Sequence, residues 1–416
     1  MWFSLDVIRA RKGDCLILHF GSKDDPHFIM IDGGPSNVYE PHLKLRLEQL
    51  RKGRDLEEQD PLPVDVMMVS HVDDDHIKGI LDLTKELRDL KQAQSPLFLR
   101  VGSLWHNSFD DLLKTTPKEL KAEAGFGAAA LAGEIEVADD EEFDAAKVLA
   151  SIPQGRDLRL DAEFFKWKIN DEFKGKLILA TGNAKAVPLK GGLKFTVVGP
   201  MKPELEALQK EHDKWLRKKK KSPEAALAAF IDKSIPNLSS IVLLAEAEGK
   251  TMLLTGDARG DKILKGLQLV GLLGPGKHSK MRVDLLKVPH HGSANNLETS
   301  FFRRITADHY VFSGNGEHGN PERESLEMLF TARGNDPFVM HFTYPIDEID
   351  VEREKDWKKE RAKEKAKKKT KIREDWSPKK HSLTAFFAAH QDFANKVSIV
   401  EEGNPHVINL LDKVGF

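Results

Sequence analysis

The sequence predicts a mixed α/β protein, and two observations support this. Segments with the patterning of short buried strands alternate with segments of helical spacing: residues 64–69 alternate and then turn apolar, whereas 77–87 repeat apolar residues at helical intervals. Five of the strand-like segments also end in Asp or His. Binding residues concentrate where an element ends and a loop begins, so we expect these ends to carry a functional site.

The expected elements follow the same two patterns along the chain. A helix is expected at 42–51, where leucines intermix with charged residues, and another begins near Ile77. A final helix and strand are expected between Ser382 and Asp412. Strands are expected at 3–10, 15–20, 28–31, 64–69, 177–180, 193–198, 241–245, 251–255, 284–288 and 310–313.

The densest polar cluster lies in Ser70–Gly79, which has two histidines and three aspartates within six residues. Imidazole and carboxylate groups together are ligands for divalent ions. An ordinary charged turn is the alternative, since Asp also caps helices well. The other strand ends argue against that alternative. They carry Asp32, Asp257, the pair His290-His291 and, slightly further on, His318.

The order of these motifs resembles the metallo-β-lactamase-fold hydrolases. The motifs are Asp32-Gly33-Gly34, then Ser70-His71-x-Asp73-x-Asp75-His76, then Leu254-Thr255-Gly256-Asp257, and then Val288-Pro289-His290-His291-Gly292-Ser293. Asp73, in place of the superfamily's more usual second His, and the opening Gly13-Asp14-Cys15-Leu16-Ile17 are similar to the hydrolase domain of ComEC-type DNA-uptake proteins. The resemblance covers roughly residues 1–345.

The resemblance implies a four-layer αββα sandwich with helical insertions. We expect a hydrolase domain over residues 1–345, with insertions at about 103–175 and 203–233. Residues 346–416 are expected to form a basic helical extension that closes with a helix and a strand.

The resemblance also implies one or two divalent metal ions, Zn²⁺ or Mn²⁺. The expected metal ligands are His71, Asp73, Asp75, His76, Asp257 and His290, with His290 only weakly favoured over His291. Asp32 is expected to support the metal loop from behind, although a turn residue before two glycines would look the same. The expected catalytic residues are Asp75, Asp257, His291 and His318, and the expected substrate-binding residues are Lys287, Ser293 and Asn320.

Two positions depart from the family pattern. Gly199 stands before Pro200 where ComEC-type sequences often carry a metal-binding His, so the first metal site is expected to be weaker. Asn320-Pro321 replaces the family's His-Pro, and His318 lies two residues earlier. His318 could reach a substrate or be an exposed loop residue, and the sequence does not decide between the two.

The charge distribution suggests a polyanionic partner. Arg353 to Arg373 holds twelve basic against four acidic residues, and Lys214–Lys221 adds six positive charges, in a chain of net charge −2. Such arms could bring nucleic acid to the site, or the Lys-Glu mixture could be a solvated helix, which is equally plausible. The 353–373 segment could also dock a protein partner.

Membrane and secreted classes are excluded on sequence grounds. One cysteine excludes an intramolecular disulfide, and no apolar run approaches 18 residues. We therefore expect a cytoplasmic protein without membrane contact.

The sequence predicts a hydrolase that uses a metal-bound hydroxide, acting as a phosphodiesterase or nuclease on nucleic acid. The alternatives are a hydrolase of a small ester, lactone or cyclic nucleotide, and a metal-poor scaffold subunit of a multiprotein system.

Overall fold

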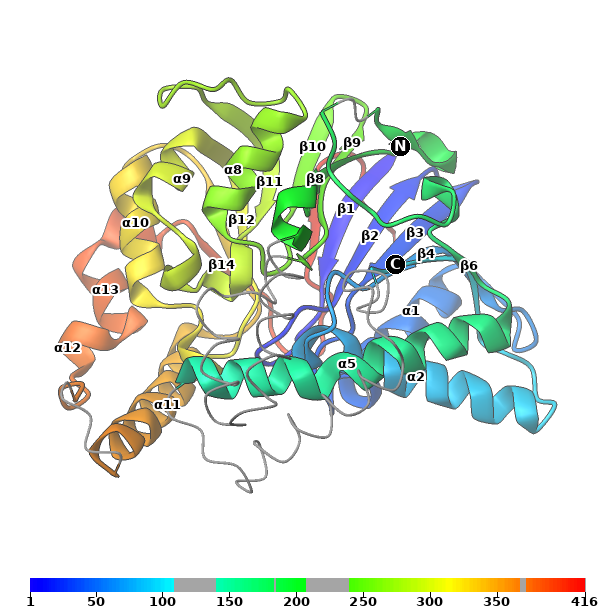
Figure 1. Ribbon diagram of the computed structural model, residues 1–416, viewed down its shortest axis with the longest axis horizontal. Helices are drawn as coiled ribbons and strands as arrows, with labels where there is room; N and C mark the ends of the chain where they lie inside the picture. The colour runs from blue at the N-terminus through cyan, green and yellow to red at the C-terminus, as the bar shows by residue number, and fades with distance from the viewer. Residues whose placement is uncertain (108–139, 183–184, 207–238, 367–371, 416) are drawn as a thin grey trace.

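The computed structural model describes residues 1–107, 140–182, 185–206, 239–366 and 372–415. Two β-sheets pack face to face in the centre, and helices cover both outer faces (Figure 1). Helices α8, α9 and α10 lie on one side and α1 and α2 on the other. The fold is therefore the αββα sandwich of the α/β class that the sequence predicts.

The first sheet has seven strands in the order β15-β1-β2-β3-β4-β5-β6. Its antiparallel part joins β15, β1, β2 and β3, and its parallel part joins β3, β4, β5 and β6. The strands are β1 (Trp2–Val7), β2 (Leu16–Gly21), β3 (Pro26–Ile31), β4 (Leu62–Met68), β5 (Leu99–Trp105), β6 (Lys168–Ile169) and β15 (Val407–Asn409).

The second sheet has eight strands in the order β14-β13-β12-β11-β10-β9-β8-β7. Strands β10 to β14 are parallel, and β7 to β10 are antiparallel. The strands are β7 (Val187–Pro188), β8 (Lys194–Gly199), β9 (Val242–Ala247), β10 (Lys250–Leu254), β11 (Met281–Lys287), β12 (Ile305–Phe312), β13 (Val339–Phe342) and β14 (Val397–Ile399).

The longer helices alternate with these strands. They are α1 (Leu45–Gly53), α2 (Asp74–Gln92), α5 (Asp140–Phe165), α8 (Gly260–Leu269), α9 (Thr299–Arg304), α10 (Arg323–Arg333), α11 (Ile346–Ala366), α12 (Pro378–His381), α13 (Leu383–Ala389) and α14 (Gln391–Ala394). A π-helical turn, Tyr39–Lys44, precedes α1, and short 3₁₀ turns include Pro289–Gly292 and Glu317–Gly319. Among the described residues, no helix is long and apolar enough to cross a membrane.

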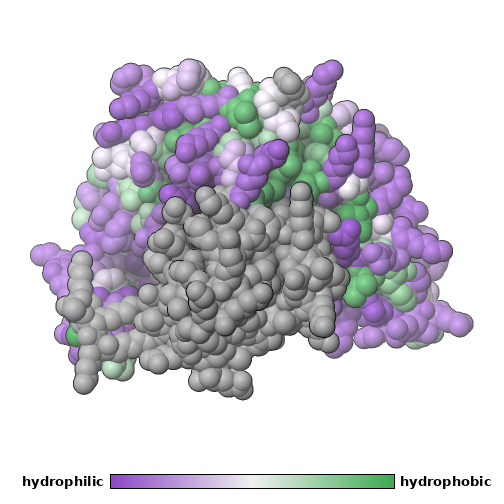
Figure 2. Space-filling model, in the orientation of Figure 1, coloured by the Kyte–Doolittle hydropathy of each residue, from purple (hydrophilic) through white to green (hydrophobic). Residues whose placement is uncertain are grey.

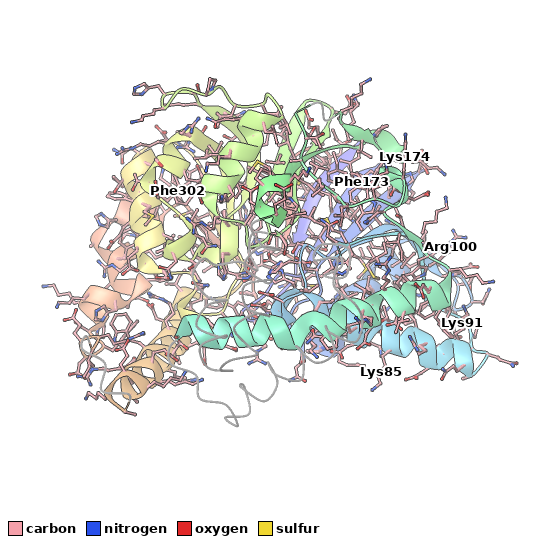
Figure 3. The ribbon with its side chains drawn as sticks, in the orientation of Figure 1. Lys85, Lys91, Arg100, Phe173, Lys174 and Phe302 are labelled. Atoms are coloured by element: carbon pink, nitrogen blue, oxygen red, sulfur yellow. The ribbon has the colours of Figure 1, made fainter. Side chains whose placement is uncertain are left out.

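Three apolar clusters correspond to the three interfaces between layers. The central cluster, which includes Phe3, Phe195 and Leu243, fills the space between the sheets. A second joins the first sheet to α1 and α2, and a third joins the second sheet to α8–α10, α11 and α13. On the face shown in Figure 2, hydrophilic residues predominate around the outline, as outward faces of covering helices require. Phe302, labelled in Figure 3, belongs to the third cluster.

Helix α5 lies across the outside of α2 (Figure 1). The buried Asp161 carboxylate accepts a hydrogen bond from Thr84 Oγ1 at 2.6 Å and pairs with Arg88. Lys91 of α2, labelled in Figure 3, lies 4.8 Å from the centre of the Phe164 ring. The predicted insertion at 103–175 thus contains a helix fixed to α2, whereas residues 108–139 of it and most of the 203–233 insertion lie outside the described residues.

The C-terminal residues complete both sheets. Strand β14 pairs with β13 of the second sheet, and β15 pairs with β1 of the first. The Met1 amino group also pairs with Asp412 at 2.6 Å. The predicted boundary at residue 345 therefore separates segments that share both sheets, and the division into two domains stays a prediction.

Within the described part of the C-terminal extension, many basic side chains form ion pairs with acidic residues of the same extension. Six of its basic residues have acidic partners: Arg353, Lys355, Lys358, Arg361, Lys363 and Arg373 pair with Asp350, Glu352, Glu354, Asp375, Glu360 and Glu364. The Arg373 guanidinium also lies 5.2 Å from the centre of the Trp357 ring, and His381 stacks on Trp357 with 4.3 Å between ring centroids. This pattern favours the solvated-helix alternative for α11. The other basic run, Lys214–Lys221, lies outside the described residues.

The strand expected at 177–180 does not form. Only an isolated bridge joins Ala180 to Met201. The Asn107 side chain instead makes the hydrogen bonds of the Ile178 backbone. Its Nδ2 donates to the Ile178 carbonyl at 2.9 Å, and its Oδ1 accepts from the Ile178 N–H at 2.8 Å.

Candidate metal centre

The segment Ser70–His76 connects β4 to the first turn of α2, and close packing against the backbone at Gly33 holds it in place. A Cβ atom at Gly79 would lie 1.9 Å from the Gly33 carbonyl oxygen, so α2 can approach the turn after β3 only with glycine there. Asp73 occupies the N-cap position of α2, yet its side chain makes no capping hydrogen bond. Its Oδ2 lies 3.6 Å from His71 Nε2 instead, which argues against the capping alternative.

Asp257 is the centre of the cluster. It follows β10 through Gly256, whose φ of +49° and close approach to Ser70 both favour glycine. Four imidazoles surround its buried carboxylate. Oδ1 lies 3.3 Å from His76 Nε2 and 3.4 Å from His291 Nε2, and Oδ2 lies 3.7 Å from His71 Nε2 and 3.6 Å from His290 Nε2.

The donor atoms of this cluster fit a divalent cation. Five buried side-chain atoms have no hydrogen-bond partner within the described residues: His71 Nε2, Asp73 Oδ1, His76 Nε2, Asp257 Oδ1 and His291 Nε2. Buried polar atoms that make no hydrogen bond are costly, so five of them on adjoining residues of one cluster indicate a bound group. Mixed imidazole and carboxylate donors are those that Zn²⁺ and Mn²⁺ accept.

The tightest group of potential ligands contains Asp14, His76, Asp257 and His291, with one donor atom of each lying within 4.8 Å of the others. This group includes His291 rather than the weakly favoured His290. His291 is buried, whereas the His290 side chain is 28% exposed. Both residues have positive φ, 49° and 54°, and their rings meet edge to face with centroids 5.9 Å apart, so that both Nε2 atoms reach Asp257.

The residues of the cluster shift the pKa values of one another. Burial raises the pKa of Asp257, but the nearby His76, His291 and His290 outweigh this and hold it well below its usual range. Burial raises the pKa of Asp75, but His76, His291 and His71 together outweigh burial and lower it. In the opposite sense, burial lowers the pKa of His76, while Asp257 and Asp32 raise it well above normal. The pKa of His291 rises to about 9, since Asp257 and Asp14 outweigh burial.

These shifts mean that imidazolium charges balance the carboxylates when no cation is bound. The protonated forms of His76 and His291 are favoured at neutral pH in the metal-free protein. A divalent ion would replace those protons.

Asp32 lies directly behind the loop. Its Oδ2 is 2.8 Å from His76 Nδ1 and accepts from Ser70 Oγ at 2.7 Å, and its Oδ1 accepts from Ser70 N–H at 2.7 Å. From this position Asp32 can support the His76 ring, and its role behind a metal ligand stays a prediction.

Asp14 is a residue of the cluster to which the sequence had assigned no role. Its Oδ2 lies 2.5 Å from Lys287 Nζ, and its Oδ1 lies 3.3 Å from His291 Nδ1 and accepts a hydrogen bond from Ser313. The Gly13-Asp14 motif was visible in the sequence. Its pairing with Lys287 was not, because Asp14 lies in the loop between β1 and β2 and Lys287 ends β11 of the other sheet.

The residues predicted to bind substrate lie elsewhere than expected. Lys287 is 1% exposed and bonded to Asp14 beneath the cluster, so it does not face a substrate. Ser293 donates to Glu322 Oε1 at 3.2 Å, and Asn320 is buried beside a cis peptide bond with Pro321. The exposed His318 places its Nε2 3.1 Å from Lys12 Nζ, on a turn that packs against α11. The substrate-binding role of Lys287 stays a prediction, and the structure shows its ammonium paired with Asp14 instead.

Gly199 is followed by a cis peptide bond to Pro200, at the end of β8. A Cβ atom there would lie 3.2 Å from Val242 Cγ2. A small hollow beside it is lined by Gly199, Ser240, Ala258, Glu204 and Lys262 among others. No imidazole is contributed from this strand end, as the sequence predicts.

Helix α5 covers one flank of the metal loop. Gln154 Nε2 donates a hydrogen bond to Asp74, and a Cβ atom at Gly155 would lie 2.9 Å from Val72 Cγ1 and 3.4 Å from His106 Nε2. His106 therefore lies between the loop and α5, where it packs.

Comparisons with known proteins give limited similarity. No protein-family model matches the chain. Microtubule-associated protein 1A of Rattus norvegicus is 30% identical over 118 residues, which make up 28% of this chain and 4% of that protein. The chain thus spans a small fraction of the curated relative that it matches.

A solved structure from Parabacteroides distasonis ATCC 8503, provisionally described as a metal-dependent hydrolase, aligns with 81% of this chain and 97% of its own. The sequence identity is 10% and the TM-score is 0.29. At these values the similarity assigns no family. The resemblance to ComEC-type proteins stays a prediction.

Proposed function

We propose that this protein is a metal-dependent hydrolase. The observation that carries the proposal is the set of five buried donor atoms, at and beside Asp257, that make no hydrogen bond within the described residues. We propose His71, Asp73, Asp75, His76, Asp257 and His291 as the residues that hold one or two divalent ions, Zn²⁺ or Mn²⁺. Asp257, which faces four imidazoles, is the residue best placed to be shared between two ions.

A bound divalent ion would supply an activated water at neutral pH and stabilise negative charge that develops on the substrate. Asp257 and Asp75 would orient that water as hydrogen-bond acceptors. His290, which is partly exposed while reaching Asp257, is the member of the pair that can contact a substrate or protonate a leaving group. His318 can act only if the substrate extends toward the turn at Lys12.

We propose a phosphodiester as the substrate, with nucleic acid as the first class to test. The order of motifs, similar to ComEC-type hydrolases, supports this, as does the basic run at Lys214–Lys221. The ion-paired α11 adds little to this support, because its basic side chains already have acidic partners.

The test is metal-dependent cleavage of single- and double-stranded DNA and RNA beside bis-p-nitrophenyl phosphate, with Mn²⁺, with Zn²⁺ and with chelator. Asp75→Ala should abolish turnover, and Asp89→Ala, an exposed carboxylate further along the same helix, should leave it intact. Metal-dependent polymer cleavage lost only in Asp75→Ala supports the nuclease. Equal activity of all three proteins would refute the mechanism.

A second candidate is a hydrolase of a small ester, lactone or cyclic nucleotide. The ion pairs along α11 favour it, since they weaken the case for a nucleic-acid arm. It predicts turnover of bis-p-nitrophenyl phosphate or a small ester, without cleavage of any polymer. A metal-free, inactive protein would instead support a scaffold role.

A further inference from the structure

Two histidines of the cluster, His76 and His291, approach Asp257 in the same way, with their ring centroids 5.4 Å apart. The Nε2 atoms of His76 and His291 lie 3.3 and 3.4 Å from the same oxygen, Asp257 Oδ1. Each ring has a carboxylate on its far side: Asp32 lies 2.8 Å from His76 Nδ1, and Asp14 lies 3.3 Å from His291 Nδ1. A carboxylate at Nδ1 keeps the proton there and leaves the Nε2 lone pair free for a ligand.

The two supports differ in one respect. Asp32 accepts hydrogen bonds from the Ser70 N–H and hydroxyl, whereas Asp14 forms an ion pair with the Lys287 ammonium at 2.5 Å. Asp14, Lys287 and His291 are each 1% exposed, so this charge pair is fully buried. Burial raises the pKa of Asp14, but Lys287 and His291 outweigh it and keep the carboxylate ionised.

The Asp14 backbone is fixed against the metal loop. Its N–H donates to the Asp75 carbonyl at 3.3 Å, and its own carbonyl accepts from Gly34 N–H at 2.7 Å. A Cβ atom at Gly13 would lie 1.8 Å from the Asp75 carbonyl oxygen, so the preceding residue must be glycine for this contact. Asp14 therefore moves only with the loop that carries His76.

Both Asp14 oxygens already have partners. Oδ2 accepts from Lys287, and Oδ1 accepts from Ser313, whose Oγ also lies 3.2 Å from His291 Nδ1. Ser313 and His291 both use Oδ1, so a metal ion could reach only Oδ2, where it would share the carboxylate with the buried Lys287 ammonium 2.5 Å away.

We propose that Asp14 is a positioning residue and not a metal ligand: with Ser313 it holds His291 as the Nδ1–H tautomer, and Lys287 keeps its carboxylate turned away from the metal. This inference rests on the proposed function only in taking His291 as a metal ligand. It assigns Lys287 to the support of the centre rather than to the substrate.

Neutral replacement of the buried charge pair tests the assignment. In Asp14→Asn/Lys287→Met, the amide oxygen can still accept from His291 Nδ1–H, while no charge is left unpaired. In Asp14→Ala/Lys287→Met that acceptor is missing. Zn²⁺ affinity, measured by competition with a chromophoric chelator, should be within about fivefold of wild type in the Asn variant and about 10- to 100-fold weaker in the Ala variant. Thermal unfolding of both metal-free variants checks that they fold.

A ligand role makes the opposite prediction. An amide is a poor replacement for a carboxylate ligand, so equal and large losses of affinity in both double variants would overturn the proposal. Affinity unchanged in both would overturn it as well.

The tautomer of His291 gives a readout independent of metal binding. In metal-free protein above pH 9, where the ring is neutral, ¹⁵N NMR should show His291 protonated at Nδ1 in wild type and in the Asn variant, and a mixed population in the Ala variant. Protonation at Nε2 in wild type would refute the inference. A wild-type protein that binds no Zn²⁺ but has the Nδ1–H tautomer would refute the proposed function alone.

Discussion

Metal binding to this protein should release protons, because the cluster holds its imidazoles protonated when no cation is present. The pKa of His291 is raised to about 9. At pH 7.5 this ring is therefore mostly protonated in the metal-free protein. His76, whose pKa lies well above normal, is protonated too. Each ring must lose a proton to bind a metal through nitrogen.

We expect the protein to release between one and two protons when metal binds to its His/Asp cluster at pH 7.5. The apparent affinity should fall by up to about tenfold per pH unit for each ring as pH drops from 9 to 7. Isothermal titration calorimetry with Mn²⁺ or Zn²⁺, repeated in buffers of different ionisation enthalpy, measures the released protons directly. Metal binding without proton release at pH 7.5 would refute the electrostatic account.

The same shift makes the stability of the metal-free protein depend on pH. The folded pKa of His291 lies above its unfolded value of 6.5, so its stabilising contribution is complete below pH 6.5 and is lost as pH rises to about 9. At about 1.4 kcal/mol per unit, the loss is roughly 3 kcal/mol. The metal-loaded protein should not show it. Urea unfolding from pH 6 to 9, with and without chelator, separates the two cases.

Three further predictions concern the rest of the fold. The pKa of the buried His341 is lowered to about 3, so stability is complete above pH 6.5 and falls toward pH 3 by roughly 1.4 kcal/mol per unit; His341→Gln should flatten this slope in urea unfolding, and an unchanged slope would contradict the shift. Gly79→Ala should destabilise by roughly 3 kcal/mol, because its Cβ would meet the Gly33 backbone at 1.9 Å, whereas Gly276→Ala, with its nearest atom at 3.5 Å, should unfold at nearly the wild-type urea concentration. Gly155→Ala should loosen α5 from the metal loop and raise amide exchange in α5 more than in the central strands; uniform exchange would show that the close contact with Val72 is unimportant.

Much of the cluster could be read from the sequence because the fold places strand ends together. His71, Asp257 and His291 each follow a strand, and their strands end at one edge, so residues far apart in the chain meet. Asp73 and His76 follow from the same loop. Their residue types already indicate a metal site before any distance is known.

The errors come from features that the local pattern does not contain. Lys287 ends β11, which is buried on both faces, so alternation could not show whether its side chain faces the cleft or the interior. Asp14 acquires its role only from Lys287, the last residue of β11, and Ser313, the residue after β12. Residues 177–180 have strand-like apolar residues, yet the Asn107 side chain takes up their backbone hydrogen bonds.

The choice between His290 and His291 also required geometry. Two adjacent histidines on an extended segment would point to opposite sides, and the sequence does not say which side faces the metal. The positive φ values of both residues, 49° and 54°, replace that alternation with a turn, so that both rings reach Asp257 while one of them stays partly exposed.

Metal binding itself tests the central claim most directly. Chelator-stripped wild-type protein and Asp257→Asn should be titrated with Zn²⁺ and Mn²⁺ and the bound metal counted by mass spectrometry. We expect one or two ions per wild-type chain, and an affinity at least about 100-fold weaker in Asp257→Asn, because that carboxylate faces all four imidazoles of the cluster. A stripped wild-type chain that takes up neither ion, or an Asp257→Asn variant that binds as tightly as wild type, would contradict the account.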